Sequence, residues 1–591
     1  MDATFFSESC LKRYEQMLKK LFFRELSRGF FYMNFYADYV ENGRVYTNYE
    51  DLKNNFKIKI PENFNFSYDI IDRYEALEPT KRALVWCDDN DEERIFTFAD
   101  IARESRRTAN YLVSKGIKKG DAVMLILRRR YEFWFFITAL HRIGAIAVPA
   151  TNQLLQKDLE YRTNAAQIKM IVSYDDTIQE EIEKALPASP SVKTLVTVQS
   201  DRKGWASYSK EISSFGTDFP RPTGEDATHN DDVMLLYFTS GTSGYPKMVQ
   251  HNFAYPLGHI VTAKYWQNVI DDGLHLTVAE TGWAKSVWGK LYGQWICGSA
   301  VFAYDMVQFK PALMLKKIEQ YKVTTFCAPP TVYNYLVRID TSKYDLSSLK
   351  YLVTAGEALN PEVYNKVYEA TGLKMFEAYG QTEATVMVGN FPGMEPKPGS
   401  MGKPAPGYDV SIVRPDGTKC NPKEPGVIVV NLEKGRPFGL FTGYYHDEEK
   451  TKSVFEGGKY LTGDTAYYDE DGYIWFIGRN DDVIKSSGYR VSPFEIESIL
   501  QQHPAVLECA VTGVPDPRRG QAIKATIVLT KLYEASEQLR ISILDWMKEK
   551  TASYKHPRII EFVSSLPKTI SGKIRRVEIR EKDESDNQQG K

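Results

Sequence analysis

The segment Thr239-Ser-Gly-Thr-Ser-Gly-Tyr-Pro-Lys247 suits the binding of an oligophosphate. Its run of small and hydroxyl residues lets the backbone approach a ligand, and the N–H and O–H groups can donate to phosphate oxygens. Lys247 adds a positive charge for the same group. Because Met248 follows this lysine, the segment differs from GxxxxGK followed by Ser or Thr, and a P-loop nucleoside triphosphatase is disfavoured. A flexible surface turn is the alternative, although a turn has no need of a lysine after a rigid proline.

Four more charged residues could act on a phosphorylated ligand. Glu383 stands beside the hydroxyl of Thr382, and one protein carboxylate together with phosphate oxygens is a common way to hold Mg²⁺. A glutamate in the first turn of a helix, after a capping threonine, is the alternative. Asp464 and Arg479 are also compatible with a turn and a surface position. Lys573 belongs to a basic run, which by itself is typical of a solvated charged face.

The ordered motifs resemble those of the adenylate-forming superfamily, which includes acyl-CoA synthetases, luciferases and the adenylation domains of peptide synthetases. Within it, the chain is most similar to medium-chain acyl-CoA synthetases over Val483–Glu497, Gln502–Val506 and Thr551–Arg576. The matching motifs are the Thr239–Lys247 segment, Ala355-Gly-Glu-Ala358, Tyr379-Gly-Gln-Thr-Glu383, Tyr460-Leu-Thr-Gly-Asp464 with Gly478-Arg479, and Pro567-Lys-Thr-Ile-Ser-Gly-Lys573.

The resemblance implies a two-step ligation. A carboxylic acid and ATP would give an acyl-adenylate and pyrophosphate, and coenzyme A would then take the acyl group and release AMP. The protein mainly positions the reactants and neutralises charge in such a phosphoryl transfer. Mg²⁺ is the implied cofactor, with ATP and coenzyme A as co-substrates. The acid is expected to be short- to medium-chain, and branched or aromatic acids stay open.

The resemblance also implies roles for individual residues. Lys573 resembles the lysine that contacts the carboxylate and the α-phosphate. Asp464 resembles the residue that accepts hydrogen bonds from both ribose hydroxyls, and Arg479 resembles its ribose or phosphate partner. Gly356, Glu357 and Ala358, with Tyr379, resemble the slot in which the adenine ring stacks. Glu383 and Thr239 are the expected metal ligands and, with Lys573, the expected catalytic residues. The expected ATP site consists of Thr239, Ser240, Gly241, Thr242, Ser243, Gly244, Tyr245, Pro246, Lys247, Gly356, Glu357, Ala358, Glu377, Ala378, Tyr379, Gly380, Gln381, Thr382, Asp464, Arg479, Arg490 and Lys573.

In the family, the small C-terminal domain rotates between the two steps, and Asp481 matches the hinge residue. This rotation would take Lys573 out of the site and bring in the loop that starts at Ser487. The expected coenzyme A site consists of Gln153, Ser487, Gly488, Tyr489, Arg519 and Arg558.

The acyl pocket is expected to include Trp283, Lys285, Trp288 and Gly380. Acetyl-CoA synthetases, which resemble this chain, carry a tryptophan where it has Gly380, so the glycine should open the pocket. The two indoles could narrow it again, and the chain length of the acid stays open. Alternatively, Trp283, Val287 and Leu291 form one buried helix face that never meets the substrate.

The elements that position these motifs follow an α/β pattern. Short apolar runs at 122–127, 170–173, 194–198, 233–238 and 351–353 predict buried strands, and Phe98–Lys115 has the spacing of an amphipathic helix. We expect a large N-terminal domain of α/β subdomains plus a β-barrel-like subdomain over 1–480. A small, mobile α+β domain is expected over 481–580, and a polar, disordered tail over 581–591.

Composition limits the other possibilities. With 591 residues the chain should form at least two folding units, and with 43% hydrophobic and 26% charged residues it is typical of a soluble protein. The net charge of −2 lacks the excess of positive charge that is typical of nucleic-acid-binding proteins. Six dispersed cysteines, the lack of a secretory signal and the lack of a membrane-spanning stretch predict a cytoplasmic protein without stable membrane insertion, and a homodimer is open.

Two alternatives remain beside the ligase. An adenylating domain with an acceptor other than coenzyme A is a first alternative. It is disfavoured by the residues of the expected coenzyme A loop that starts at Ser487 and by the lack of a carrier domain. A catalytically silent sensor of nucleotide or acyl-CoA is disfavoured because Glu383, Asp464 and Lys573 are all present.

Overall fold

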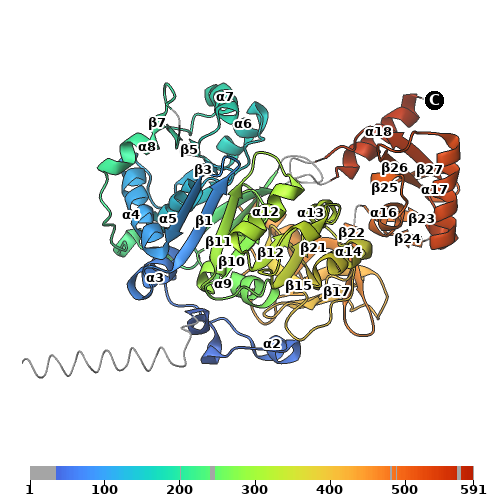
Figure 1. The fold of residues 1–591 in the computed structure, drawn as a ribbon, viewed down its shortest axis with the longest axis horizontal. Helices are drawn as coiled ribbons and strands as arrows, with labels where there is room; N and C mark the ends of the chain where they lie inside the picture. Colours follow the sequence, from blue (N-terminus) through green and yellow to red (C-terminus); the bar gives the residue numbers. More distant parts are fainter. Residues whose placement is uncertain are drawn as a thin grey trace, which may run out of the picture.

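The computed structural model describes residues 35–199, 201–239, 246–479, 482–487, 489–568 and 574–589. Two large sheets with helices packed against them form most of the molecule (Figure 1). A five-stranded antiparallel sheet follows them in sequence, and a last sheet belongs to the C-terminal residues. The described residues therefore have the mixed α/β architecture that the sequence predicts.

The first large sheet has eight strands in the order β19-β9-β8-β4-β3-β5-β6-β7. Parallel pairing joins its central strands, which are buried and rich in Val, Ile, Leu and Met, as expected for strands covered on both faces. Its strands are β3 (Ala122–Ile126), β4 (Ile146–Pro149), β5 (Met170–Ser173), β6 (Thr194–Thr197), β7 (Ala206–Ser207), β8 (Val233–Thr239), β9 (Lys247–Asn252) and β19 (Gly443–Tyr444).

The second large sheet has nine strands in the order β16-β15-β14-β13-β12-β10-β11-β1-β2. β10 through β14 pair in parallel, so their carboxyl ends lie along one edge. Its strands are β1 (Arg82–Asp88), β2 (Glu93–Thr97), β10 (Leu274–Thr277), β11 (Ala300–Asp305), β12 (Thr325–Ala328), β13 (Tyr351–Ala355), β14 (Met375–Gln381), β15 (Ala384–Gly389) and β16 (Lys403–Pro404).

The helices cover the two sheets. In α4 (Phe98–Ser114), Thr97 and Asp100 form a capping box, and the predicted apolar face is buried. The other α-helices of at least five residues in this part of the chain are α2 (Tyr49–Asn55), α3 (Asp72–Leu77), α5 (Glu132–Ile143), α6 (Gln156–Ala165), α7 (Asp176–Ala185), α9 (Tyr255–Ile260), α10 (Lys285–Gly289), α11 (Tyr292–Ile296), α12 (Pro311–Tyr321), α13 (Pro330–Leu336) and α14 (Pro361–Thr371).

The barrel-like subdomain contains β17 (Asp409–Val413), β18 (Gly426–Asn431), α15 (Glu448–Val454), β20 (Phe455–Glu456), β21 (Lys459–Tyr468) and β22 (Ile474–Arg479). Its β21 is the long central strand, pairing with β18 on one side and with β20 and β22 on the other. Side chains two residues apart on a strand share a face, so Tyr460, Thr462 and Asp464 point the same way.

The C-terminal residues form their own sheet and core (Figure 1). Its elements are β23 (Ile484–Ser486), β24 (Tyr489–Val491), α16 (Pro493–Leu500), β25 (Val506–Asp516), β26 (Gly520–Leu529), α17 (Glu537–Lys550), β27 (Ile559–Val563) and α18 (Arg576–Gln589).

The described residues of the predicted polar tail, from residue 581 onward, belong to a helix in the structure. α18 continues to Gln589. Ile579 is buried at its start, and Asp583 pairs with the buried Lys524. These two contacts could not be predicted from the polar composition, because each involves a single residue in an otherwise solvated stretch.

Candidate active site

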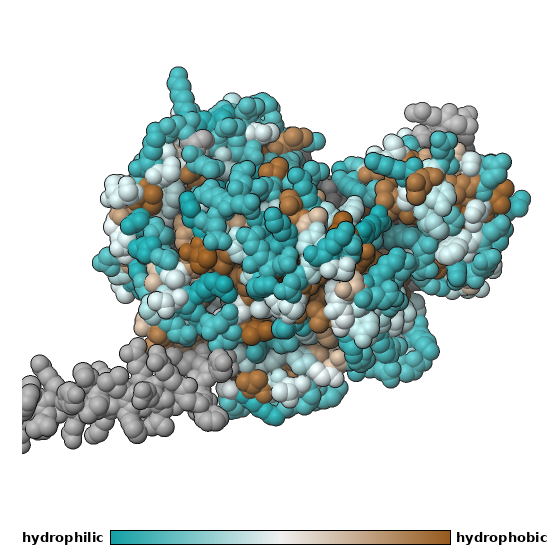
Figure 2. Space-filling view, viewed as in Figure 1, coloured by the Kyte–Doolittle hydropathy of each residue, from teal (hydrophilic) through white to brown (hydrophobic). Residues whose placement is uncertain are grey.

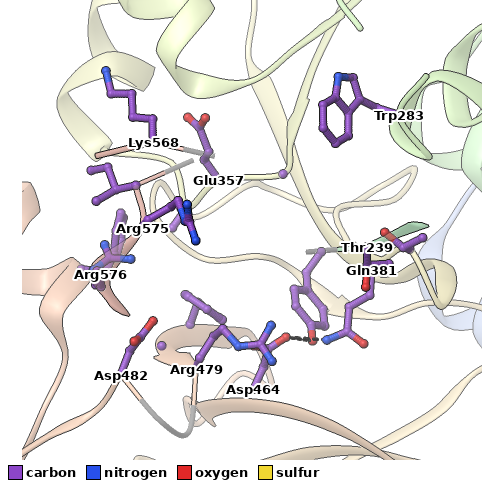
Figure 3. A pocket seen from close by; sticks show the side chains of 18 of the residues that line it. Thr239, Trp283, Glu357, Gln381, Asp464, Arg479, Asp482, Lys568, Arg575 and Arg576 are labelled. Carbon is purple, nitrogen blue, oxygen red and sulfur yellow. Dashed lines mark hydrogen bonds between the residues drawn. The ribbon is translucent and has the colours of Figure 1, made fainter. Parts of the chain in front are cut away.

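A cleft of about 2200 Å³ lies between the large domain and the C-terminal elements (Figure 3). Residues from all five motifs line it, although the motifs are far apart in sequence. The lining includes Thr239, Lys247, Gly356, Glu357, Ala358, Glu377, Ala378, Tyr379, Gly380, Gln381, Thr382, Glu383, Asp464, Arg479 and Lys568.

The predicted phosphate segment is the connection between β8 and β9. Thr239 ends β8 and pairs in register with Lys247, which begins β9. The ammonium of Lys247 lies over the Tyr444 ring, 5.3 Å from its centroid, and Pro246 also lines the cleft. Residues Ser240, Gly241, Thr242, Ser243, Gly244 and Tyr245 lie outside the described residues. Both ends of the segment thus open onto the cleft.

Glu383 follows the β14 strand, in the turn before β15. The phenol of Tyr444 donates to its Oε1 at 2.9 Å. Burial raises the pKa of Glu383, while the Tyr444 hydrogen bond and the Lys247 charge act in the opposite direction. Among the described residues no group of three or more His, Cys, Asp or Glu could hold a metal ion. A single carboxylate beside a phosphate site fits Mg²⁺ held largely by substrate oxygens.

A hydrogen bond from His251 on β9 holds the same turn in place. Its Nε2 is 2.9 Å from the Thr382 carbonyl oxygen, and burial lowers the pKa of this imidazole to about 3. The ring is therefore neutral at pH 7, and because a carbonyl only accepts, the proton is on Nε2. The His251 ring also stacks on Tyr255, with centroids 3.8 Å apart. The turn that carries Thr382 and Glu383 is thus anchored to the first large sheet.

Asp464 sits at the centre of a second hydrogen-bond group. Its Oδ2 accepts from the Tyr379 phenol at 2.6 Å and from the Gln381 amide at 2.7 Å (Figure 3). The carboxylate is only 5% exposed. Arg479 on β22 is its cross-strand partner, which places the predicted ribose and phosphate residues side by side.

The predicted adenine slot lies at the carboxyl ends of β13 and β14. Gly356 has φ of +96°, a conformation that favours glycine, and the loop continues through Glu357, whose carboxylate accepts from Thr331. Glu377 is buried, and burial raises its pKa well above the ordinary value. With Ala358 and Ala378 these residues form one wall of the cleft.

The predicted acyl residues separate into two groups. Trp283 lines the cleft in the turn before α10, whereas Trp288 is buried and packs on Gly380. A Cβ on Gly380 would lie 2.4 Å from Trp288 Cη2. Val287 is buried on α10, as the alternative of one buried helix face requires. Trp283, however, precedes that helix, so the structure agrees with this alternative only in part.

Lys285 takes a different place from the one predicted for an acyl-pocket residue. Its ammonium donates to the Ala355 carbonyl oxygen, next to Gly356. It therefore connects the segment before α10 to the loop of the predicted adenine slot.

The predicted coenzyme A residues that the structure describes do not line the cleft. Tyr489 is 52% exposed and stacks on Tyr554, with ring centroids 4.4 Å apart. Ser487 and Arg519 are joined by a backbone hydrogen bond of 2.9 Å, and Arg558 and Gln153 are exposed elsewhere on the surface. Gly488 and the side chain of Arg490 lie outside the described residues.

Asp481 and Lys573 also lie outside the described residues, but their neighbours are placed. Lys568, Ile574 and Arg575, on either side of Lys573, line the cleft. Arg576 forms a bidentate pair with the buried Glu497, with contacts of 2.7 and 2.8 Å. The described residues on both sides of Lys573 therefore lie at the cleft.

Sequence reasoning missed three residues of this site, His251, Tyr444 and Tyr460. The period of two along β21 places Tyr460 on the face of Asp464 and could have indicated it. His251 and Tyr444 lie on strands of the other sheet, and no spacing in the sequence connects them to the Tyr379–Glu383 motif.

Comparison with known proteins gives family matches along most of the chain. Residues 71–445 match the family model described as AMP-binding enzyme, and residues 495–573 match AMP-binding enzyme C-terminal domain. The mitochondrial acyl-coenzyme A synthetase ACSM3 of Mus musculus is 41% identical over 559 residues, covering 93% of this chain and 96% of that protein. The human mitochondrial acyl-coenzyme A synthetase ACSM5 is 39% identical, covering 88% and 91%.

Solved structures give the same comparison in three dimensions. The crystal structure of the anthranilate CoA ligase AuaEII in complex with anthranoyl-AMP has a TM-score of 0.81 at 31% identity, covering 89% of this chain and 99% of that one. This agreement extends through both the large domain and the C-terminal elements.

The predicted cytoplasmic location is contradicted by these relatives, since the ACSM3 proteins of mouse, rat, orangutan and human are mitochondrial. The criteria behind the prediction, cysteine spacing and the lack of a secretory signal, test only for secretion. They do not separate the two reducing compartments. Within the described part of the chain, no helix has the length and hydropathy to cross a bilayer, and hydrophilic side chains dominate the face in Figure 2.

Proposed function

Because the chain belongs to the AMP-binding enzyme family, we propose that it is an ATP-dependent, AMP-forming acyl-CoA synthetase. The observation that carries this proposal is the convergence of five sequence motifs on one cleft. A protein that only stored a ligand would have no need for a buried carboxylate and a phosphate segment at the same place.

The reaction has two balanced steps. An oxygen of the substrate carboxylate bonds to the α-phosphorus of ATP while the bond to the bridging oxygen breaks, and pyrophosphate leaves. The sulfur of coenzyme A, after losing its proton, then bonds to the acyl carbon, and the bond from that carbon to the AMP oxygen breaks. Splitting the ligation in this way gives each step a good leaving group.

Four residues have the main roles in the first step. Thr239 and Lys247 bind the phosphates at the two ends of their segment, Asp464 accepts the ribose hydroxyls, and Lys573 neutralises charge between the carboxylate and the α-phosphate. Charge neutralisation by positioned groups is the largest catalytic contribution expected for such a transfer. Arg479 beside Asp464 supplies a further positive charge.

Glu383 and Thr239 are the proposed ligands of Mg²⁺, which supplies charge neutralisation to the phosphates when bound. The Tyr444 hydrogen bond holds the Glu383 carboxylate in one orientation. Its position beside Lys247 keeps it within the phosphate site.

The substrate is proposed to be a short- to medium-chain carboxylic acid, with branched or aromatic acids included. Support comes from Gly380, which lines the cleft, and from the buried Trp288 that packs on it. Trp266 packs edge-on against Trp288, with ring centroids 6.2 Å apart, and stiffens this side of the cleft. A rigid aromatic packing behind Gly380 favours compact acyl groups over long flexible ones.

The second step requires a domain rotation about Asp481. In the described arrangement the neighbours of Lys573 face the cleft, while Ser487, Tyr489 and Arg519 do not. We propose that residues 481–580 turn as a unit relative to residues 1–480, which brings the coenzyme A residues to the adenylate. The separate sheet and core of the C-terminal elements support this division. A homodimer stays a prediction.

The test is pyrophosphate release with ATP, coenzyme A and a panel of straight, branched and aromatic acids. We expect pyrophosphate, AMP and acyl-CoA in equal amounts with one group of compact acids. Glu383→Gln is the matched variant, because it keeps the shape and removes the charge, and it should lower the rate by about a hundredfold or more. ADP and phosphate as products, or no release with any acid, would contradict the proposal.

A further inference from the structure

The side-chain amide of Gln381 is held from three directions. Its Nε2 donates to the Thr462 carbonyl oxygen at 2.9 Å and to Asp464 Oδ2 at 2.7 Å. Its Oε1 accepts from the phenol of Tyr460 at 2.7 Å. Such a set of contacts leaves one amide orientation, with the nitrogen toward the carboxylate.

The chemistry of the partners supports this orientation independently. A backbone carbonyl and a carboxylate can only accept, so the amide nitrogen must face Thr462 and Asp464. The amide oxygen then faces Tyr460, whose hydroxyl must donate. A flipped amide would place its oxygen against the Asp464 carboxylate and lose the hydrogen bonds to Thr462 and Asp464.

Tyr460 is itself fixed in place. It is 2% exposed, and its ring packs against Phe441 and Phe455 at centroid distances of 5.5 and 5.4 Å. Phe441 also packs against Tyr444, which donates to Glu383. This aromatic cluster, which joins the barrel-like subdomain to β19, therefore supports both Gln381 and Glu383 of the Tyr379–Glu383 motif.

We propose that Tyr460 is a positioning residue for recognition of the ribose. Through Gln381 it fixes the Asp464 carboxylate in the orientation that accepts the nucleotide hydroxyls. Two side-chain donors to Asp464, Gln381 and Tyr379, converge on Oδ2 and so help to set the rotation of the carboxylate about its bond to Cβ. This inference rests on the proposed role of Asp464 and adds the residue that orients it.

The test compares ATP with 2′-deoxy-ATP in Tyr460→Phe. Removing the hydroxyl leaves a buried amide oxygen without its donor and frees the amide to turn. We expect kcat/KM for ATP to fall about tenfold, mainly through KM, as for the loss of one buried hydrogen bond. The value for 2′-deoxy-ATP should fall less, because that nucleotide keeps only one of the two hydroxyls that the carboxylate would hold. The preference for ATP over 2′-deoxy-ATP should therefore fall severalfold.

Tyr468→Phe is the matched control. It removes the same hydroxyl from the same strand, where Tyr468 donates to the Cys420 carbonyl oxygen away from the cleft. Its preference for ATP should equal that of the wild type. If Tyr460→Phe folds poorly, Gln381→Met tests the same link, and adding Tyr460→Phe to it should not lower the preference further.

An unchanged preference in Tyr460→Phe or Gln381→Met would overturn the inference, even if both nucleotides lost activity equally. A wild type that uses ATP and 2′-deoxy-ATP equally well would instead overturn the role of Asp464 itself. A wild type without ATP-dependent pyrophosphate release would contradict the proposed function. The three failures are therefore distinguishable.

Discussion

Around Glu383, burial and hydrogen bonding act on one carboxylate in opposite directions. Burial raises its pKa, and the Tyr444 phenol and the Lys247 ammonium lower it. A cation bound with the phosphates would favour the charged form further. The residue is thus set for a ligand that brings both negative phosphates and a positive ion, and this supports its placement in the ATP site.

Gly380 gives a residue-scale prediction. A Cβ there would lie 2.4 Å from Trp288 Cη2 and 2.5 Å from the Thr385 carbonyl oxygen. Because one of these atoms belongs to the backbone, Gly380→Ala should lower the free energy of unfolding by about 1 to 3 kcal/mol, as measured by denaturant titration. The same shift would move the wall of the acyl pocket.

Gly216→Ala is the control for this prediction. Nothing lies within 4 Å of a Cβ built on Gly216. This variant should unfold like the wild type. Equal stability of the Gly380 and Gly216 variants would show that Trp288 does not pack on Gly380.

At the scale of elements, the site is built where strands end. β13 and β14 end side by side and deliver Gly356 and the Tyr379–Glu383 motif to the same edge. β8 and β9 deliver Thr239 and Lys247 from the other sheet, and β21 brings Asp464. This arrangement follows the rule that ligands bind at the carboxyl ends of parallel strands.

Much of this framework could be predicted from the sequence. The apolar runs that become β3, β5 and β8 are short and continuous, and the helical spacing of α4 is regular. The hydrogen bonds of His251 and Tyr444 could not be predicted, because they join strands of different sheets. The packing of Trp288 on Gly380 could not be predicted either, because it depends on how α10 packs against β14.

His275 on β10 gives an element-scale prediction. It bridges Thr325 and Thr277 at 2.7 and 2.8 Å, and burial lowers its pKa to about 3. The unfolded chain, with an ordinary pKa near 6.5, binds more protons between these two values. The free energy of unfolding should therefore rise with pH from about 3 to 6.5, by at most about 1.4 kcal/mol per unit from this residue.

The measurement is denaturant stability from pH 4.5 to 7.5. His275→Gln should have a shallower dependence than the wild type below pH 6.5. His229→Gln, at an exposed position, serves as the control and should keep the wild-type slope. Identical slopes for wild type and His275→Gln would show that this imidazole is protonated in the folded state.

At the scale of the whole molecule, the C-terminal elements present one face to the cleft and another to solvent. The segments next to Lys573 are on the first face, and Tyr489 and Arg519 are on the second. Arg580 of α18 pairs with Asp482 at 2.6 Å, so the last helix is tied to the residue after the predicted hinge. Rotation of the domain would exchange the two faces.

Two substitutions should therefore have opposite effects on the half-reactions. Lys573→Ala should lower acyl-adenylate formation by about a hundredfold and leave thioester formation from added adenylate nearly intact. Arg519→Ala should spare adenylate formation and raise KM for coenzyme A by about tenfold. Quenched-flow assays of each half-reaction give the comparison. Equal losses in both half-reactions for either variant would contradict the alternation of faces.

The central claim is that the acid is activated as an adenylate, and oxygen transfer tests it most directly. The acid is labelled with ¹⁸O in its carboxylate and turned over with ATP and coenzyme A. Because the carboxylate oxygen bonds to the α-phosphorus and stays there when the sulfur displaces AMP, we expect one ¹⁸O atom in AMP for each acyl-CoA formed. Mass spectrometry should find none in pyrophosphate. Label in inorganic phosphate, or unlabelled AMP, would contradict the account.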